Sequence, residues 1–282
     1  MPNRTKDMLM TSYEECQMKS NRVLIDCQSI IGHTGGMRSV RSRKAGPPHE
    51  RRAVPAPTRI ASAIRCQILS CGLPPGERIT ESLLSRKYSV GQPTVREALF
   101  LLEREGLVTR VPNIGTFVRE LDIPDVANLY QIRGALEGLA AELAAQRATA
   151  EEISQLRELG HEMERRAKTS GKTGFFQADL EFHRFLWKIS GNPELPGILD
   201  PVVTPLLTFS FLRIERTLEE LLQSSANHQE IVEALTSGPA AAREALERNN
   251  RLFLERYMAS VLSVLMPDHG RSRLAGPALP PA

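Results

Sequence analysis

A carboxylate and an imidazole lie one helical turn apart in the second half of the chain. Residues 174–190 form a helical pattern in which most charged side chains share one polar arc. At 100° per residue, Asp179 and His183 fall instead in the apolar arc, so both are predicted to point inward. A buried charge without a partner is costly. This i, i+4 pair is therefore a candidate to bind one cation.

A second histidine, His228, is also predicted to point inward, because it lies in line with Ile231 and Leu235 on another helical pattern. Two interpretations remain open. The three side chains could hold a divalent cation such as zinc. Alternatively, Asp179 and His183 form a hydrogen-bonded pair and His228 is a separate core histidine, and spacing alone favours this second interpretation.

Helices must position these residues. From Pro124 to about Met266 the sequence shows helical patterns and no strand pattern. We predict an all-helical effector-binding and dimerisation domain over residues 122–266, built as a bundle. Its helices are expected at 124–147, 149–168, 174–190, 194–222, 226–236 and 239–264. Two arginines occur on apolar parts of this pattern: Arg133, which has Glu137 at i+4 as a ready ion-pair partner, and Arg213.

The preceding block, residues 58–121, has a different organisation. Three helical patterns are followed by two alternating segments, LVTRV and GTFVRE, with PNIG as a turn between them. This order predicts a winged helix-turn-helix. The fold class is therefore mainly α: a winged helix with a small β-hairpin wing, then an all-α bundle.

The third helix of this block would enter the major groove of DNA, with the residues near its start facing the bases. Gln92, Thr94 and Arg96 lie there, away from the apolar face, and Arg96 could contact guanine or phosphate. In the hairpin, Asn113 and Gly115 permit a tight tip and Arg110 is a candidate phosphate contact. The alternative is a surface ion pair for Arg96. Its neighbours at i−4 and i+4 are Gln92 and Phe100, so no partner is expected on its own helix.

Residues 59–118 resemble the winged-helix signature of the GntR regulator superfamily, most clearly in PPGERI, VREAL, EGLV and GTFV. The resemblance implies operator-binding roles for Thr94, Arg96 and Gly115. The chain departs from the family pattern at three positions. The family usually has Ser or Thr where Gly91 stands, Arg where Gln92 stands, and often a basic residue where Ile114 stands. These departures indicate fewer phosphate contacts or a different operator.

The helical domain is similar to the FCD effector-binding domain of the FadR-type branch of that superfamily, on the segments RGALEGLAAELAA, DLEFHRFLWKISGN and NHQEIVEAL. The resemblance implies a metal site on Asp179, His183 and His228. A further histidine is expected near 249–250, where this chain has Asn249 and Asn250, and an amide oxygen is a poorer zinc ligand. The resemblance also implies that Arg133 binds an effector carboxylate, with Arg213 as a second candidate anion anchor.

Charge is unevenly distributed along the chain. The first 121 residues hold 19 Lys and Arg against 11 Asp and Glu, whereas residues 122–266 hold 15 against 21. This asymmetry is typical of a protein in which only the first part meets a polyanion. Residues 1–57 are predicted to be a disordered basic extension and 267–282 a disordered tail. Because neither a secretory signal nor a run of about 18 apolar residues is evident, we expect a cytoplasmic protein without a membrane partner.

Together these patterns predict a homodimeric transcription regulator, repressor or activator, that binds an inverted-repeat operator. A small organic acid, with a divalent metal ion such as zinc as cofactor, would control it. Two alternatives remain: a DNA-binding regulator whose helical domain only dimerises, and a metal-dependent hydrolase using Asp179, His183 and His228. The hydrolase leaves the winged helix unexplained and lacks a nucleophile motif, so we expect no catalytic residues and no enzyme.

Overall fold

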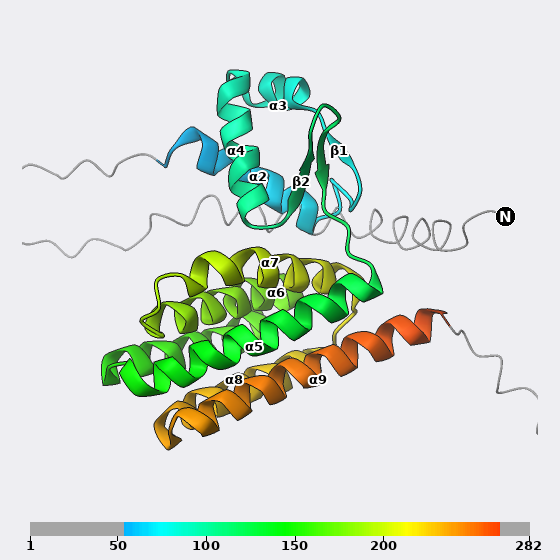
Figure 1. The fold of residues 1–282 in the computed structure, drawn as a ribbon. Helices are drawn as coiled ribbons and strands as arrows, with labels where there is room; N and C mark the ends of the chain where they lie inside the picture. The colour runs from blue at the N-terminus through cyan, green and yellow to red at the C-terminus, as the bar shows by residue number, and fades with distance from the viewer. Residues whose placement is uncertain (1–53, 266–282) are drawn as a thin grey trace, which may run out of the picture.

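The computed structural model describes residues 54–265, in which a small N-terminal domain lies over one side of a helical bundle (Figure 1). The N-terminal domain contains α2 (Ala56–Leu69), β1 (Arg78–Ile79), α3 (Glu81–Tyr88), α4 (Gln92–Arg104), β2 (Val108–Val111) and β3 (Gly115–Val118). Helix α2 begins two residues before the predicted domain boundary. Residues 1–53 of the predicted basic extension, and the predicted tail, lie outside the described residues.

Helix α4 shows why this domain folds as predicted. Its buried residues are Val95, Ala98, Leu99 and Leu102, which recur at the i, i+3, i+4, i+7 spacing of one helical face. Gly91 precedes the helix in an extended conformation, and no side chain caps the first turn. Pro93 has no N–H and the Thr94 N–H donates to the Gly91 carbonyl at 3.1 Å, so the first turn offers few backbone N–H groups to an anion.

The sheet has three strands, in the order β1-β3-β2, and both pairings are antiparallel. The predicted hairpin is β2 and β3, with Val108 opposite Val118. The third strand, β1, was not predicted, because two residues are too short for a visible alternation. It pairs Arg78 with Phe117 and so ties the segment before α3 to the wing.

The C-terminal domain is helical throughout its described part and contains α5 (Ile123–Arg147), α6 (Ala150–Ile189), α7 (Leu195–Arg213), α8 (Leu218–Ser237) and α9 (Pro239–Leu265). The predicted helix over 194–222 is wrong: the chain leaves the helix after Arg213 and re-enters it at Leu218. A capping box explains the new start, because Thr217 accepts from the Glu220 backbone and the Glu220 carboxylate accepts from the Thr217 backbone. The helix predicted at 226–236 accordingly begins earlier.

Helix α6 consists of two helices that meet at a kink, in agreement with the two helices predicted at 149–168 and 174–190. Gly171, at φ 59° and ψ −148°, makes a kink inside it. Glycine adopts this left-handed backbone without steric cost, so a single residue suffices to redirect the chain. The second half of α6, after this kink, carries Asp179 and His183.

Helix α7 contains an 18-residue stretch, Leu195–Leu212, that is long and apolar enough to cross a membrane by length and composition alone. The sequence was predicted to lack such a segment because polar residues and prolines interrupt the apolar ones. Of this stretch, 56% is buried, and α7 packs against α5 and α6. A core helix with one outward apolar face has these properties.

The two domains share one apolar core. Ile64, Leu99 and Val118 of the N-terminal domain belong to the same buried cluster as Leu206 and Tyr257 of the bundle. The fold class is thus confirmed as a winged helix-turn-helix joined to an all-α domain, and the shared core packs the two parts directly against each other.

A contact between a side chain and a backbone carbonyl reinforces the junction between the two domains. Pro205 has no N–H, so the carbonyl of Pro201, four residues earlier in α7, has no helical partner. Arg119, just after β3, directs Nη1 to this carbonyl at 3.5 Å. Gly106, at φ 71°, lies so close that a Cβ atom there would be 2.6 Å from the same oxygen. A side chain at residue 106 would push the two domains apart.

Candidate functional site: a DNA-facing surface and a buried polar cluster

The structure places Gln92, Thr94 and Arg96 in the first turns of α4. Gln92 and Arg96 are exposed and Thr94 is half-buried. Figure 1 shows α4 running from beside α3 toward the bundle, so that its start and the tip of the β2–β3 hairpin lie at the end of the domain away from the bundle. This position leaves the start of α4 accessible to a large partner.

Arg96 has an ion-pair partner on another helix, although none is available on its own. Its Nε lies 2.7 Å from Glu81 Oε2 on α3, and the Arg96 side chain remains 60% exposed. The partner is fifteen residues away in sequence, so helical spacing could not reveal it. Exposed pairs of this kind contribute only about 0–1 kcal/mol. Arg96 can therefore exchange Glu81 for a phosphate or a guanine at little cost.

The wing is held at its tip by a residue that sequence reasoning missed. Arg78, on β1, donates from Nη2 to the carbonyl of Ile114 at 2.7 Å. Gly115 has φ 144°, and a Cβ atom there would lie 3.0 Å from Arg78 Nε, while Asn113 at φ 61° completes the turn. Arg110 is exposed and contacts Glu103 only loosely, at 3.8 Å. The only signal for Arg78 was its place in PPGERI.

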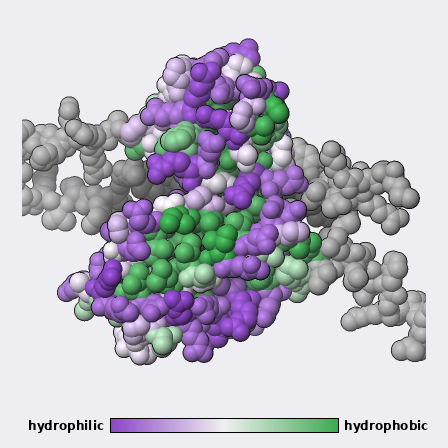
Figure 2. All heavy atoms as spheres, viewed as in Figure 1, coloured by the Kyte–Doolittle hydropathy of each residue, from purple (hydrophilic) through white to green (hydrophobic). Residues whose placement is uncertain are grey.

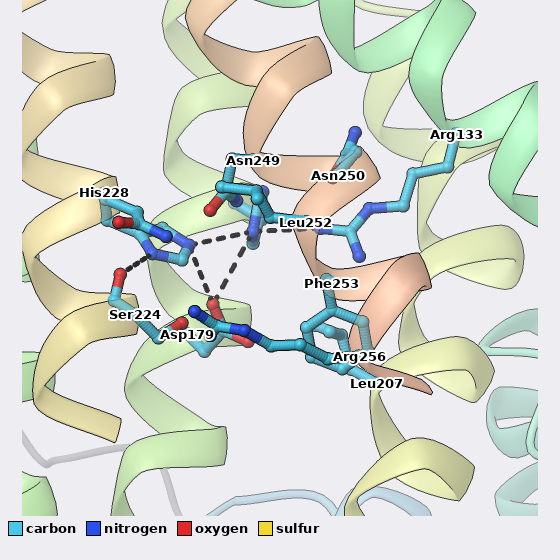
Figure 3. A pocket seen from close by; sticks show the side chains of 12 residues that line it. Arg133, Asp179, Leu207, Ser224, His228, Asn249, Asn250, Leu252, Phe253 and Arg256 are labelled. Atoms are coloured by element: carbon cyan, nitrogen blue, oxygen red, sulfur yellow. Dashed lines mark hydrogen bonds and ion pairs between the residues drawn. The ribbon is translucent and has the colours of Figure 1, made fainter. Parts of the chain in front are cut away.

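The bundle brings Asp179, His183 and His228 together, as the cation interpretation requires. His228 Nε2 lies 3.0 Å and His183 Nε2 3.6 Å from Asp179 Oδ1, and the two imidazole nitrogens are 3.2 Å apart. The candidate ligand atoms all lie within 4.8 Å of one another, and all three residues are buried. Figure 3 shows the side chains converging from α6 and α8. The separate-core-histidine interpretation of His228 is therefore wrong.

Neighbouring groups set the tautomer of each histidine. His228 Nδ1 lies 2.7 Å from the Ser224 carbonyl, which can only accept, so Nδ1 carries a proton. Arg133 Nη2 lies 3.0 Å from His183 Nε2, and arginine can only donate, so this Nε2 carries a lone pair. In a neutral ring, the Nε2 lone pair of His228 then faces the Asp179 carboxylate, whereas the Nε2 lone pair of His183 accepts from Arg133.

Two acceptors that face each other, here His228 Nε2 and Asp179 Oδ1, repel unless a proton or a cation lies between them. Asp179 Oδ1 is buried without a hydrogen-bond partner, although His228 Nε2 is close. An oxygen and two imidazole nitrogens are also a donor set that suits zinc and similar divalent ions. The residues present therefore fit a divalent cation.

Glu137 is a buried carboxylate that holds several side chains around the cluster in place. Its carboxylate receives hydrogen bonds from Arg133 Nε at 2.7 Å, Trp187 Nε1 at 3.0 Å and Asn250 Nδ2 at 3.0 Å. His183 Nδ1 is 2.9 Å away, but it is not aligned as a hydrogen bond, so we treat the contact as electrostatic orientation of the ring. A carboxylate on the far nitrogen of a metal-binding histidine is a common second layer of metal sites.

Electrostatics keep both buried carboxylates ionised. Burial alone would raise the pKa of Asp179, but the adjacent imidazoles of His228 and His183 and the Arg133 guanidinium lower the pKa below its usual value. Burial likewise opposes ionisation of Glu137, and the charges of Arg133 and His183 outweigh it and lower the pKa of Glu137. The cluster thus presents negative charge to a cation.

The cavity at the cluster is small. Arg133, Asp179, His183, His228 and Asn249 are among its lining residues, and its volume is about 10 Å³. This is room for roughly one water or ion. Asn249 and Asn250 both line it. Asn250 donates from Nδ2 to Glu137, and its Oδ1, the atom that would ligate a cation, is buried without a hydrogen-bond partner.

A larger cavity of about 320 Å³ opens beside it, between α9 and the start of α8. Phe253 and Arg256 line both cavities, and Arg216 lines the larger one. Figure 3 shows Arg256 reaching across the small cavity toward Asp179. Sequence reasoning missed Arg216 and Arg256 because no helical pattern shows which residues from separate helices meet at a cavity mouth.

Arg216 is a partly buried guanidinium packed over the rings of Phe175 and Phe253. Its Nη2 donates to the Glu220 carbonyl at 3.0 Å, and burial lowers the pKa of Arg216. Arg213 ends α7, and its side chain lies outside the described part of the structure. Its predicted anion-binding role therefore stays a prediction.

Comparison with known proteins places the chain in a family. The model of bacterial regulatory proteins of the gntR family matches residues 57–118, and the model of the FCD domain matches residues 128–251. The Nta operon transcriptional regulator of Aminobacter aminovorans is 40% identical over 121 residues, 43% of this chain and 57% of that protein. An uncharacterised HTH-type regulator of Streptomyces ambofaciens is 30% identical over 195 residues, 67% of this chain and 79% of that protein.

The solved structure of E. coli McbR/YncC has the same fold, with a TM-score of 0.60 at 19% identity, over 75% of this chain and 99% of that one. The match covers only 57–60% of the length of the first curated relatives. The chain belongs to the GntR family of bacterial regulatory proteins. Within that family it is a member with an FCD domain.

Proposed function

We propose that this chain is a DNA-binding transcription regulator whose operator affinity is controlled by a small organic acid and a divalent cation in the helical domain. The observation that carries the proposal is the convergence of Asp179, His183 and His228 in a domain that shares one apolar core with a winged helix. The names of the relatives support the regulatory role.

DNA binding is assigned to the start of α4 and to the wing. Arg96 would read a base edge or clamp a phosphate, Thr94 and Gln92 would contact DNA beside it, and Arg110 and the tip at Asn113 and Gly115 would reach the backbone. The exposure of Gln92, Arg96, Arg110 and Asn113 supports these roles.

The effector is assigned to the two adjoining cavities. A divalent cation held by Asp179, His183 and His228 would leave coordination positions for a carboxylate oxygen. The organic part of the acid would occupy the 320 Å³ cavity, whose volume lies in the usual range for ligand sites. Arg133 would face the acid from the inner cavity, and Arg216 and Arg256 would bind it at the mouth.

Phe253 supports a route from this cavity to the DNA-binding domain. Its ring lies 5.9 Å from that of Tyr130, centre to centre, at 20°, and Tyr130 belongs to the core shared by both domains. An acid that moved Phe253 would repack this core and bias the position of the N-terminal domain.

A second copy of the chain is the proposed partner of an apolar face on the bundle. Figure 2 shows a continuous apolar area over α5 and α7, and within it Ile132 is 45% and Ile198 49% exposed. The α5 residues on this stripe alternate at spacings of three and four, as in coiled-coil seams: Leu129, Ile132, Leu136, Leu139 and Leu143. A two-fold pairing of this face would set two winged helices on an inverted repeat.

A thermal-shift screen of small mono- and dicarboxylates, with and without a chelator, tests the effector site. We expect at least one acid to raise the melting temperature only when a divalent cation is present, and the same acid to change affinity for promoter DNA. A regulator whose helical domain only dimerises is the second candidate, favoured by the small inner cavity and the amides at 249 and 250. It predicts DNA binding that no acid or cation alters.

A further inference from the structure

Arg133 makes two contacts that place it at the cation site itself. Its Nε donates to Glu137 at 2.7 Å, and its Nη2 donates to His183 Nε2 at 3.0 Å. The whole side chain is buried, at 2% exposure. Arg133 therefore does more than line the cavity with a charge, because its N–H group occupies the lone pair of His183 Nε2 that a cation would need.

One imidazole nitrogen has one lone pair, so it cannot serve a guanidinium N–H and a metal ion at once. His183 has no alternative nitrogen to offer, because Nδ1 faces Glu137 Oε1 at 2.9 Å. Rotating the ring would break that contact and turn Nδ1 away from its only nearby anion. Guanidinium and cation are thus exclusive at His183 Nε2.

We infer that Arg133 is a gate for the cation site: the cation and the Arg133 guanidinium compete for His183 Nε2. This inference rests on the proposed cation site and adds that Arg133 must release His183 Nε2 before a cation can bind there. When the cation is bound, Nη2 loses its acceptor and becomes available to an acidic group in the cavity. An acid that engages Arg133 in turn favours the cation, since coupling between two ligands is reciprocal.

The other charged groups of the cavity do not duplicate this arrangement. Arg256 reaches toward Asp179 from the mouth (Figure 3), and Arg216 contacts the Glu220 carbonyl. Asn250 donates to Glu137 rather than to a histidine. Among the described residues outside the set of Asp179, His183 and His228, Arg133 is the side chain that donates a hydrogen bond to a candidate ligand nitrogen.

Zinc titration of the purified full chain, by competition with a chromogenic chelator, tests the gate. In Arg133→Lys the charge beside Glu137 is kept, but the ammonium lacks the second arm that reaches His183. We expect zinc to bind roughly tenfold or more tightly to Arg133→Lys, the gain expected when one charge-assisted hydrogen bond no longer competes. Arg133→Met should bind at least as tightly as Arg133→Lys.

Arg256→Met separates competition from simple charge repulsion, because it removes one positive charge from the same cavity and leaves the bond to His183. Its gain in zinc affinity should be smaller than that of Arg133→Lys. His183→Ala verifies that the titrated ion is at this site, and circular dichroism verifies folding. Unchanged or weaker zinc binding in Arg133→Lys, with tight binding in the wild type, would overturn the gate and leave the cation site standing.

A measurement on the wild type needs no variant. The side-chain ¹⁵N–¹H signals of Arg133 should shift when one equivalent of zinc is added, because the acceptor of Nη2 is removed. If zinc bound in the chelator assay and those signals did not move, the gate would be wrong. If zinc bound neither the wild type nor any Arg133 variant, the proposed cation site would fall, and the gate with it.

Discussion

Glu137 Oε1 lies 2.9 Å from His183 Nδ1, and this contact between α5 and α6 aims the opposite nitrogen of the ring at Asp179. The same carboxylate binds Arg133, Trp187 and Asn250. One buried group from the first helix of the bundle thus orients donors from α5, α6 and α9.

Replacing Glu137 with Gln should destabilise the bundle strongly. The substitution keeps the shape but leaves the Arg133 guanidinium buried without its counter-charge, and breaking one side of a buried pair costs about 3–5 kcal/mol. We expect a loss of that size in the free energy of unfolding, measured by urea denaturation. Glu142→Gln, which removes a half-exposed partner of Arg243, serves as the control and should cost about 1 kcal/mol or less. Equal losses in the two variants would contradict the role given to Glu137.

His183→Ala should abolish bound metal. The variant removes one of three converging ligands and the ring that Glu137 orients, so elemental analysis should detect metal in the wild type and none in the variant. His161→Ala is the matched control, since His161 is exposed on the first half of α6. A metal content that survived His183→Ala would move the site elsewhere in the molecule.

Arg96→Ala should weaken operator binding by about 1–3 kcal/mol, if the contact is to a base, and relax specificity at one base pair. The loss of the exposed pair with Glu81 should barely affect stability. Gel-shift titration measures the affinity, and Arg104→Ala, at the opposite end of α4, is the control. Operator affinity that was equal in Arg96→Ala and the wild type would remove Arg96 from the reading surface.

Two glycine substitutions should change stability in opposite directions. Gly115→Ala places a Cβ at φ 144°, 3.0 Å from Arg78 Nε, so we expect a loss of about 1–3 kcal/mol and weaker DNA binding through the wing. A Cβ at Gly134, in helix α5, would meet no atom within 4 Å, so Gly134→Ala should gain about 0.5–1 kcal/mol. Thermal unfolding of both variants decides the matter: changes of the same sign would contradict the wing geometry.

Ile132→Glu should convert a dimer into a monomer. The side chain is exposed in the single chain, so a charge there costs little until the apolar face of α5 and α7 is covered by a second copy. Light scattering coupled to size exclusion gives the mass, and Gln131→Glu, one residue away and also exposed, is the control. A wild type that eluted as a monomer would refute the pairing directly.

Local patterns in the sequence predicted much of this fold. The apolar spacing of Val95, Leu99 and Leu102 placed the reading helix, because burial of one helical face leaves a regular trace. The two-residue strand β1 left no such trace. The break between α7 and α8 is marked by the capping box of Thr217 and Glu220, and the predicted helix over 194–222 ran through it because apolar residues continue on both sides.

The site was predictable only in part. The inward positions of Asp179, His183 and His228 follow from helical periodicity, since each lies on an apolar face of its own helix. The identity of the side chains that surround these three residues does not follow from helical periodicity. The contacts of Arg133 with His183 and of Asn250 with Glu137, like the pair between Arg96 and Glu81, depend on how separate helices pack.

The salt dependence of binding to DNA from the neighbourhood of its own promoter tests the central claim most directly. Contacts with several phosphates should make the logarithm of the association constant fall linearly with the logarithm of the salt concentration. We predict that fluorescence anisotropy will show such a slope, and that Arg96→Ala will lower the affinity on that DNA. The absence of any salt-sensitive binding by the folded wild-type protein would contradict the account.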